Sequence, residues 1–238
     1  VEAEFIRALR ERGYIPGDYR ERKRFVSRIF EVPFNDMKTV IADEGVKGAE
    51  LGRQLSFEDL LEAGFKIDFK NFSEDIKKKL WEKIYQFSAD TFLRIEGDFI
   101  KTLAEGYKEG LGIDEVARNL RDDFKNLRDY RLRNIARTEI QGAQNEGSHQ
   151  TMQDYGVRYK QWLTVGDDRV RGNDPYDEYD HIHLHGQVVE FDEPYSNGMM
   201  YPGDRSGDIG DWINCRCRER PYIPRKGEFI LTTPYYPN

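Results

Sequence analysis

The clearest pattern in the chain is a stripe of apolar residues at three- and four-residue spacing between Ser73 and Gly106. Such spacing places side chains on one face of a helix. Ser73 is a suitable N-cap, and Glu74 and Asp75 follow it in the first turn. The stripe consists of Ile76, Leu80, Ile84, Phe87, Thr91, Ile95, Phe99 and Leu103. This pattern predicts one long amphipathic helix that buries its aromatic residues, which are Trp81, Tyr85, Phe87, Phe92 and Phe99.

The first seventy residues show shorter and less regular patterns. The predicted elements are a helix near Glu4–Arg12, a break over Gly13–Gly17, a basic helix over Tyr19–Phe30 and a short helix over Ser56–Ala63. Pro33 and the glycines after it predict loops between the last two helices. Ser56 is expected to cap the short helix, and Gly64 is expected to end it.

The periodicity changes from helical to alternating near Gly156. Before it, helices are predicted from Asp114 to about Phe124 and from about Asp129 to Tyr155. After it, alternation predicts strands over Tyr159 and Gln161–Val165, Gln187–Phe191, Ile213–Cys217 and Phe229–Leu231. Long loops rich in Gly, Pro and Asp join these strands, and loops of that length are usually functional or ordered by a partner.

These patterns predict an α+β fold, with long amphipathic helices in the N-terminal half followed by a small C-terminal β-rich domain with long loops. We divide the chain into an irregular and helical region over residues 1–70, a long helix over 71–113 and an α+β domain over 114–238.

Composition indicates a globular protein with a polar surface. The charged fraction is 34%, the hydrophobic fraction 38% and the mean hydropathy -0.81. Two cysteines give no disulfide framework, and no apolar run approaches the roughly 20 residues that cross a bilayer. We therefore expect a soluble intracellular protein without a membrane partner. The start at Val1 carries no signal-peptide pattern, and it leaves open a trimmed chain, proteolytic maturation or a leader ahead of it.

The net charge of -7 is unevenly distributed. Basic residues gather between Arg10 and Arg24 and again between Arg216 and Lys226, whereas acidic residues dominate from Asp167 to Asp211. Any DNA contact is therefore local, weak, nonspecific and salt-dependent. The alternative is that both basic clusters are solvated surfaces without a partner.

The cysteines lie in the run Asn214-Cys215-Arg216-Cys217, and three of the four histidines lie upstream at His181, His183 and His185. Histidine and cysteine together are the ligands of tetrahedral zinc. Thiols one residue apart point to opposite sides of an extended chain, so a shared ion requires a turn. We predict a structural Zn²⁺ site formed by His181, His185, Cys215 and Cys217, with His183 pointing away. The alternative is two buried thiols beside hydrogen-bonding histidines.

Several short motifs follow one another in a characteristic order. They are Ile135-Ala136-Arg137-Thr138-Glu139-Ile140, then Ala143, Asn145 and Gly147, Tyr155-Gly156, Trp162-Leu163-Thr164, Asp167-Asp168-Arg169-Val170-Arg171, His181 before Gly186, Pro202-Gly203-Asp204 and Asn214-Cys215-Arg216-Cys217. In this order, over about residues 114–222, the chain resembles the phage Mu protein F-like family of tailed-virus minor head proteins, to which SPP1-type head morphogenesis proteins belong. Nine residues intervene here between Arg171 and His181, more than the family pattern has.

The resemblance implies a structural minor head protein that acts in head morphogenesis and is not an enzyme. Its implied partners are the portal protein, with the major capsid protein and viral DNA as further candidates. Its implied location is the virion, in the head interior or at the portal vertex, after assembly in the host cytoplasm. We expect the helical half, residues 1 to about 110, to bind the portal.

Charged motif residues have structural interpretations. Arg137 and Glu139 face different sides of a helix, so we expect Arg137 to pair with Asp167 and Glu139 with Arg169 or Arg171. Asp167 and Arg171 are expected to fix the loop after the first strand. Arg216, Arg218 and Arg220 are expected to share one face of the last strand, which could contact phosphate or an acidic partner.

The alternative function class is an enzyme associated with the virus head. The histidines, Asn214 and the cysteines resemble the set of a metal-dependent His-Asn-His nuclease. The Arg137-Thr138-Glu139 run is similar to that of ADP-ribosyltransferases. Against the nuclease, the cysteine pair follows the histidines and no histidine comes after it. Against the transferase, one arginine and one glutamate on a single helix do not make a nicotinamide pocket.

Overall fold

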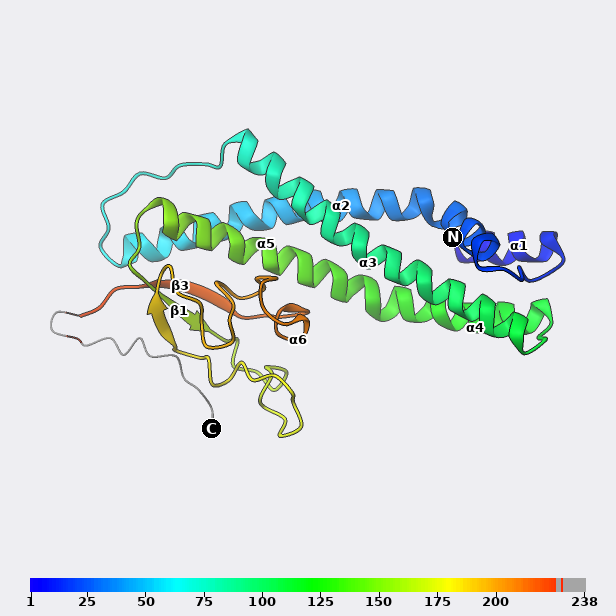
Figure 1. The fold of residues 1–238 in the computed structure, drawn as a ribbon. Coiled ribbons are helices and arrows are strands. Elements are labelled where there is room, and N and C mark those ends of the chain that lie inside the picture. Colours follow the sequence, from blue (N-terminus) through cyan, green and yellow to red (C-terminus); the bar gives the residue numbers. More distant parts are fainter. Residues whose placement is uncertain (226–227, 229–238) are drawn as a thin grey trace. The chain divides into compact units, whose positions relative to one another are not determined.

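The computed structural model describes residues 1–225 and residue 228, so the predicted strand over Phe229–Leu231 and the basic residue Lys226 lie outside the described part. The fold is α+β, as predicted, with long helices followed by a small antiparallel sheet (Figure 1). The elements are α1 (Glu2–Arg12), α2 (Tyr19–Glu62), α3 (Glu74–Lys108), α4 (Ile113–Asn126), η1 (Leu127–Arg131), α5 (Leu132–Asp154), β1 (Tyr159–Leu163), β2 (Val188–Glu190), α6 (Ile209–Trp212) and β3 (Arg218–Tyr222).

The chain divides into two compact units, each made from separate stretches of sequence. A helical unit comprises Val1–Ala42 and Glu82–Ala136, and a mixed unit comprises Asp43–Trp81 and the chain from Arg137 onward. The three long helices α2, α3 and α5 each contribute residues to both units. No helix in the described part of the chain is long and apolar enough to cross a membrane.

The helical unit has an aromatic core. The ring of Phe5 on α1 lies 5.2 to 5.9 Å from four other phenylalanine rings, measured between centroids. Phe99 on α3 lies 4.7 Å from Phe124 on α4. Of the aromatic residues of α3 predicted to be buried, Phe92 and Phe99 are, whereas Trp81, Tyr85 and Phe87 are only half-buried. Ile95 and Leu103 of the apolar stripe are buried as well. Tilted and edge-to-face rings at these distances attract one another beyond their burial, so they hold the four helical segments together.

The predicted break at Pro33 is wrong, because α2 continues through it. A proline inside a helix removes one backbone hydrogen bond and usually kinks or ends the helix. Here the next residue, Phe34, stacks on Phe30 at 4.3 Å and lies 4.5 Å from Phe92. We attribute the intact helix to this packing. Ser56, expected as an N-cap, is likewise a buried residue inside α2.

The glycines expected to form loops after Pro33 instead allow two helices of the mixed unit to pack closely. A Cβ added to Gly52 on α2 would lie 1.8 Å from the carbonyl oxygen of Gln144 on α5. A Cβ added to Gly147 on α5 would lie 2.0 Å from the carbonyl oxygen of Ala49. Ser148 adds a hydrogen bond of 2.9 Å to the Gly52 carbonyl. Gly52 and Gly147 therefore allow α2 and α5 to approach more closely than any residue with a Cβ atom at these positions would.

The predicted interruption between the helices at 114–124 and 129–155 is also wrong. The chain stays helical from Ile113 to Asp154, with the π-helical segment η1 in the middle. Such segments are one-turn widenings of an α-helix, and sequence spacing alone does not reveal them. Gly156 follows with a positive φ of 64° after the helix ends, as predicted.

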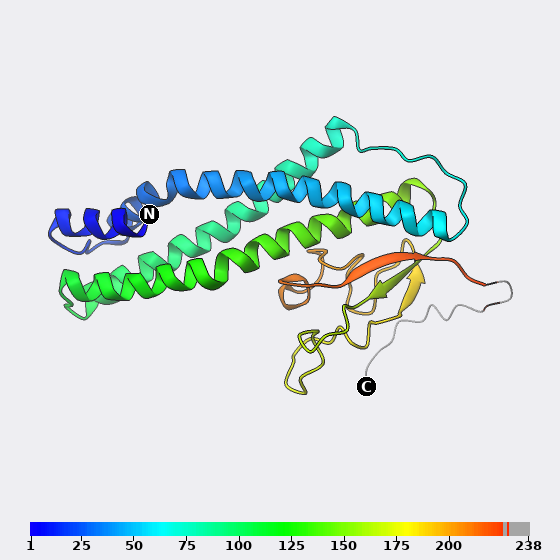
Figure 2. The same cartoon turned by 180° about the vertical axis from the view of Figure 1, so that it is seen from behind.

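The mixed unit carries a three-stranded antiparallel sheet in the order β2-β1-β3. Tyr159 pairs with Glu190 on one side and with Tyr222 on the other. Figure 2, seen from behind, shows β3 in orange beside β1. The strand predicted over Ile213–Cys217 is wrong, because Asn214 adopts a left-handed conformation with φ of 53°. The strand begins only at Arg218.

Candidate functional site

Helix α5 holds the turn that carries the two cysteines. The backbone N–H of Asn214 donates to Thr138 Oγ1 at 2.8 Å, and Arg137 Nη1 donates to Asn214 Oδ1 at 3.2 Å. Two turns further along α5, Asn145 Nδ2 donates to the carbonyl oxygens of Cys217, at 2.9 Å, and Pro202, at 2.8 Å. The motif residues of α5 therefore fix the path of the chain on both sides of the cysteines.

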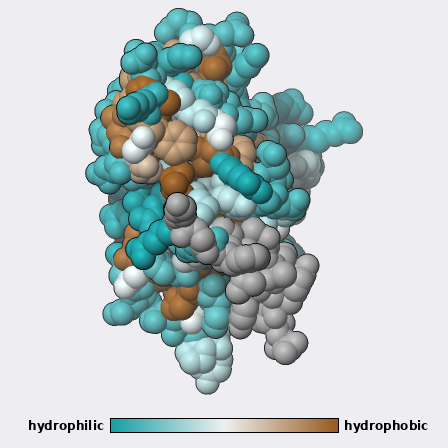
Figure 3. Space-filling model, turned by 90° about the vertical axis from the view of Figure 1, so that its left-hand side faces the viewer, coloured by the Kyte–Doolittle hydropathy of each residue, from teal (hydrophilic) through white to brown (hydrophobic). Residues whose placement is uncertain are grey.

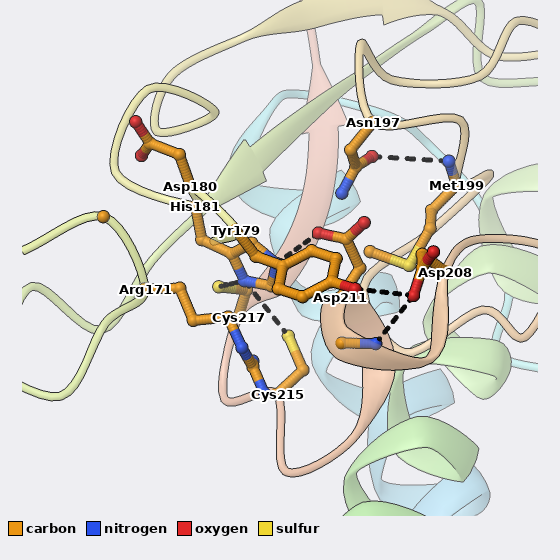
Figure 4. A network of polar contacts seen from close by, with 12 residues as sticks. Arg171, Tyr179, Asp180, His181, Asn197, Met199, Asp208, Asp211, Cys215 and Cys217 are labelled. Carbon is orange, nitrogen blue, oxygen red and sulfur yellow. Dashed lines mark hydrogen bonds and ion pairs between the residues drawn. The ribbon is translucent and has the colours of Figure 1, made fainter. Parts of the chain in front are cut away.

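This turn places both thiols beside one imidazole nitrogen. His181 Nδ1 lies 3.5 Å from Cys217 Sγ and 3.7 Å from Cys215 Sγ (Figure 4). These three donor atoms lie within 4.8 Å of one another. The three residues are only 1 to 3% exposed. The bend at Asn214 therefore does what an extended strand could not, because it brings two thiols one residue apart to the same point.

Asp211 holds the other nitrogen of the His181 ring. Its Oδ1 lies 3.1 Å from His181 Nε2, and both residues are buried. A carboxylate there favours a proton on Nε2 and leaves the lone pair of Nδ1 toward the thiols. Asp211 lies in the short helix α6, whose N-cap Asp208 accepts a hydrogen bond from the Gly210 N–H at 3.2 Å. Tyr179 OH also donates to Asp208, at 2.8 Å.

The rest of the cysteine environment is largely apolar. The thiols belong to a buried cluster formed by Trp162, Leu184, Val189, Tyr195, Met199, Cys215 and Cys217. The Trp162 ring meets the His181 ring edge-on, with centroids 5.5 Å apart. The indole N–H of Trp162 is buried and meets no acceptor in hydrogen-bond geometry among the described residues. It is nevertheless near Cys217, where it partly opposes the rise in the pKa of that thiol that Cys215 and burial cause.

The acid–base properties of the three groups are strongly coupled. A hydrogen bond from Cys217 is the main cause that lowers the pKa of Cys215 well below its usual value, and His181 adds to this effect. The same contact and burial raise the pKa of Cys217. Burial alone lowers the pKa of His181, but the hydrogen bonds to Asp211 and Cys215 leave it raised. One negative charge is therefore favoured on the thiol pair.

The other two histidines of the predicted cluster lie elsewhere. His185 Nδ1 accepts a hydrogen bond from the Thr164 backbone N–H at 3.1 Å and lies 3.0 Å from Thr164 Oγ1. His183 is exposed and pairs with Asp180. The structure thus brings together three of the four predicted metal ligands, His181, Cys215 and Cys217, and places His185 at the end of β1.

The charged motif residues have partners other than those expected. Glu139 pairs with Arg205, not with Arg169 or Arg171, and burial raises its pKa against the opposing effect of that arginine. Asp167 forms a two-point ion pair with Arg216, not with Arg137, and its pKa falls to about 2. Asp167 also accepts the Arg169 backbone N–H at 3.0 Å, as a loop-fixing residue should.

The remaining motif arginines also make contacts within the mixed unit. Arg171 donates to the carbonyl of Ile213, next to the cysteine turn. Arg218 pairs with Asp59 on α2 at 3.2 Å, and Arg220 donates to Gln161 Oε1 at 3.0 and 2.8 Å. Arg216, Arg218 and Arg220, which are predicted to contact DNA or a partner, therefore each already have an acceptor within the mixed unit.

The sequence did not indicate a second buried polar network beside β1 and β3. Glu219 contacts His149 Nδ1 at 2.9 Å and accepts from Tyr195 OH at 3.4 Å. Lys160 is fully buried, donates to the Met200 carbonyl at 2.7 Å, and has its pKa lowered to about 8 by burial. Alternation along β1 places Lys160 on the same buried face of the sheet as Trp162, and this pattern could have revealed it. Lysine is usually expected at the surface, so the residue type pointed the other way.

Comparison with known proteins gives one family and one relative. Residues 98–220 match the model of a family described as "Phage Mu protein F like protein". An uncharacterised protein of Methanocaldococcus jannaschii is 30% identical over 114 residues, which is 48% of this chain but only 16% of that protein. The chain thus spans a small part of the curated relative that it matches. No solved structure matches.

Proposed function

The chain belongs to the phage Mu protein F-like family, and from this premise we propose that it is a structural minor head protein of a tailed virus or prophage, acting in head morphogenesis by binding the portal. The observation that carries the proposal is the family match, which covers just over half of the chain and includes the whole α5–cysteine-turn assembly. The proposed location is the virion head, and the proposed role is structural and not enzymatic.

A groove on the helical unit suits the proposed contact. It has a volume of about 560 Å³ and runs between α2 and α3. Its α2 side carries Arg24, Arg28 and Lys38, and its α3 side carries Leu93, which is 60% exposed. Val32 and Val40 on α2 are similarly exposed. The lining also includes Glu31 and Glu96, so three cationic side chains stand against two acidic ones. This excess of positive charge, together with the apolar Leu93, fits an acidic, partly apolar segment of a partner. We place the portal contact here.

The mixed unit contributes a different surface. Figure 3 shows apolar side chains gathered among hydrophilic ones on the face at the left of Figure 1. Exposed apolar residues of this unit include Leu61, Phe69 and Ile223. We do not place the portal contact there, because Phe69 packs against Phe57, with ring centroids 5.1 Å apart, and Leu61 follows the fully buried Leu60. Substitution at these positions would disturb folding as well as binding.

An enzymatic role has less support in the geometry. The His181 and cysteine cluster is almost fully buried, so a phosphate of DNA cannot reach it without local opening. Arg137 is engaged by Asn214 and Glu139 by Arg205, so the two groups are not free to line a common nicotinamide pocket. These contacts favour the structural role over nuclease and ADP-ribosyltransferase chemistry.

The test is binding of the full chain to the portal ring encoded by the same genome. Deleting residues 1–70 would be unsuitable, because it removes the α2 segment that packs on α5 in the mixed unit. Leu93→Asp in the groove is the informative change, with Val165→Asp as the matched control. Val165 is an apolar residue of similar exposure, 54%, in the mixed unit.

We expect Leu93→Asp to weaken portal binding at least tenfold, as loss of a buried anchor does, with an unchanged circular dichroism spectrum. Val165→Asp should bind like the wild type. If the wild-type chain shows no binding to the portal ring in gradient co-sedimentation, the proposed function is wrong. If both variants bind like the wild type, the portal contact lies outside the groove.

A further inference from the structure

We propose that His181 Nδ1, Cys215 Sγ and Cys217 Sγ bind one Zn²⁺ ion. The ion would link the acidic loops of residues 167–211, which contain His181, to the turn of residues 213–217, which contains both cysteines. In the sequence, His181 is separated from Cys215 by 34 positions and from Cys217 by 36 positions. The inference does not depend on portal binding. The structure offers three protein ligands in place of the four-ligand set predicted from the sequence.

The distances fit a tetrahedral ion. A zinc ion about 2.3 Å from sulfur and about 2.0 to 2.1 Å from nitrogen, at a tetrahedral angle, separates the two donor atoms by about 3.6 Å. The observed separations from His181 Nδ1 are 3.5 Å to Cys217 Sγ and 3.7 Å to Cys215 Sγ. Both edges therefore already have the length that an ion would impose.

Hydrogen bonding alone explains the arrangement less well. Whether it carries a lone pair or a proton, Nδ1 can make only one directed hydrogen bond to a sulfur at a time. Yet the two sulfurs lie at nearly equal distances from it. An ion at the centre uses that lone pair and both sulfurs together. The Asp211–His181 contact of 3.1 Å is the carboxylate–histidine pair that commonly supports a metal-bound imidazole.

Charge and burial agree with the same assignment. Two thiolates and a neutral imidazole around Zn²⁺ form a group with no net charge, which a largely apolar cluster tolerates. The unpartnered indole N–H of Trp162 near Cys217 would then have a thiolate sulfur to face. Although three protein ligands are also the number in catalytic zinc sites, exposures of 1 to 3% make this one structural.

The first experiment measures zinc in the full chain, purified without a metal-affinity step and then loaded with Zn²⁺ and desalted. We expect about one zinc per chain, a fall in melting temperature on chelation, and recovery when Zn²⁺ is restored. Loading with Co²⁺ should give the visible bands of a tetrahedral site and a thiolate charge-transfer band. Less than a tenth of an equivalent of zinc with no chelator effect, or a Co²⁺ spectrum without thiolate bands, overturns the proposal.

Variants identify the ligands. Cys215→Ser and Cys217→Ser should each lose zinc, whereas His185→Ala and His183→Ala, in the same segment, should keep it. Loss of zinc in a folded His185→Ala chain would overturn the three-ligand set.

Asp211→Asn tests the positioning residue without removing a ligand. It should weaken zinc affinity about 10- to 100-fold while the thiolate bands remain. Asp208→Asn is the matched control, because asparagine caps a helix as well as aspartate does and residue 208 does not touch His181. Equal zinc affinity in both variants and the wild type would contradict the assigned role of Asp211.

Discussion

Replacing Asn145 should reveal how strongly α5 holds the cysteine turn. The Asn145 side chain is 1% exposed, and its amide nitrogen donates to the carbonyls of Pro202 and Cys217. Asn145→Ala removes both hydrogen bonds and leaves two carbonyl groups without these partners. A typical hydrogen bond contributes about 1 kcal/mol, and a stranded buried group costs about 1–3 kcal/mol. We therefore expect unfolding free energy to fall by about 2–4 kcal/mol.

Asn145→Asp separates the chemistry from the volume. A carboxylate is nearly the same size but can only accept hydrogen bonds, so it would face two carbonyl oxygens with no proton to share. At neutral pH this variant should be less stable than Asn145→Ala, and acidification that protonates the new carboxyl should narrow the difference.

The assay is urea unfolding followed by circular dichroism, with Gln150→Ala as control. Gln150 lies on the same helix, and its hydrogen bonds to Gln153 and Asp154 are exposed, so its loss should change stability by less than about 0.5 kcal/mol. If Asn145→Asp is as stable as the wild type, the Asn145 amide nitrogen does not donate to these carbonyls. Helix α5 then does not fix the chain at Pro202 and Cys217 through this residue.

Two further predictions concern packing and pH. Gly147→Ala should destabilise the chain by about 1–3 kcal/mol in urea unfolding, because the new Cβ would lie 2.0 Å from the Ala49 carbonyl oxygen. Gly97 is an exposed helix position with open space around it, so Gly97→Ala should stabilise the chain by up to about 1 kcal/mol. Equal effects of the two changes would argue against the close α2–α5 contact. Burial lowers the pKa of Lys160 from 10.5 to about 8 in the folded chain. Between these pH values the unfolded chain binds more protons than the folded chain, so the free energy of unfolding should rise with pH, by at most about 3 kcal/mol. The difference in unfolding free energy between wild type and Lys160→Met, measured from pH 8 to 10.5, should show this rise. A difference that does not change with pH would mean that burial does not lower the pKa of Lys160.

The parts of the fold that follow from local pattern were predictable. Ser73 and the stripe that follows it gave the start and the buried face of α3, because capping and 3.6-residue spacing are properties of one segment. The α2 helix was missed because Pro33, Gly48 and Gly52 are ordinarily helix breakers. Their effect here depends on Phe92 and on the backbone of α5, which lie far away in the sequence.

The candidate site divides in the same way. Residue type alone selected His181, Cys215 and Cys217, since few side chains bind zinc. The exclusion of His185 and the inclusion of Asp211 depend on where α6 and the end of β1 bring these groups. The left-handed backbone of Asn214, which turns both thiols to one side, is stabilised by Thr138 and Arg137 on α5, so alternation within residues 213–217 could not reveal it.

The proposed role in the virus head is tested most directly by quantitative mass spectrometry of particles produced by the genome that encodes this chain. We expect the chain to be present in purified heads and to remain with the portal ring when heads are disrupted. Heads that contain the portal but lack the chain at every stage of assembly, although it is expressed in the same cells, would contradict the proposed role.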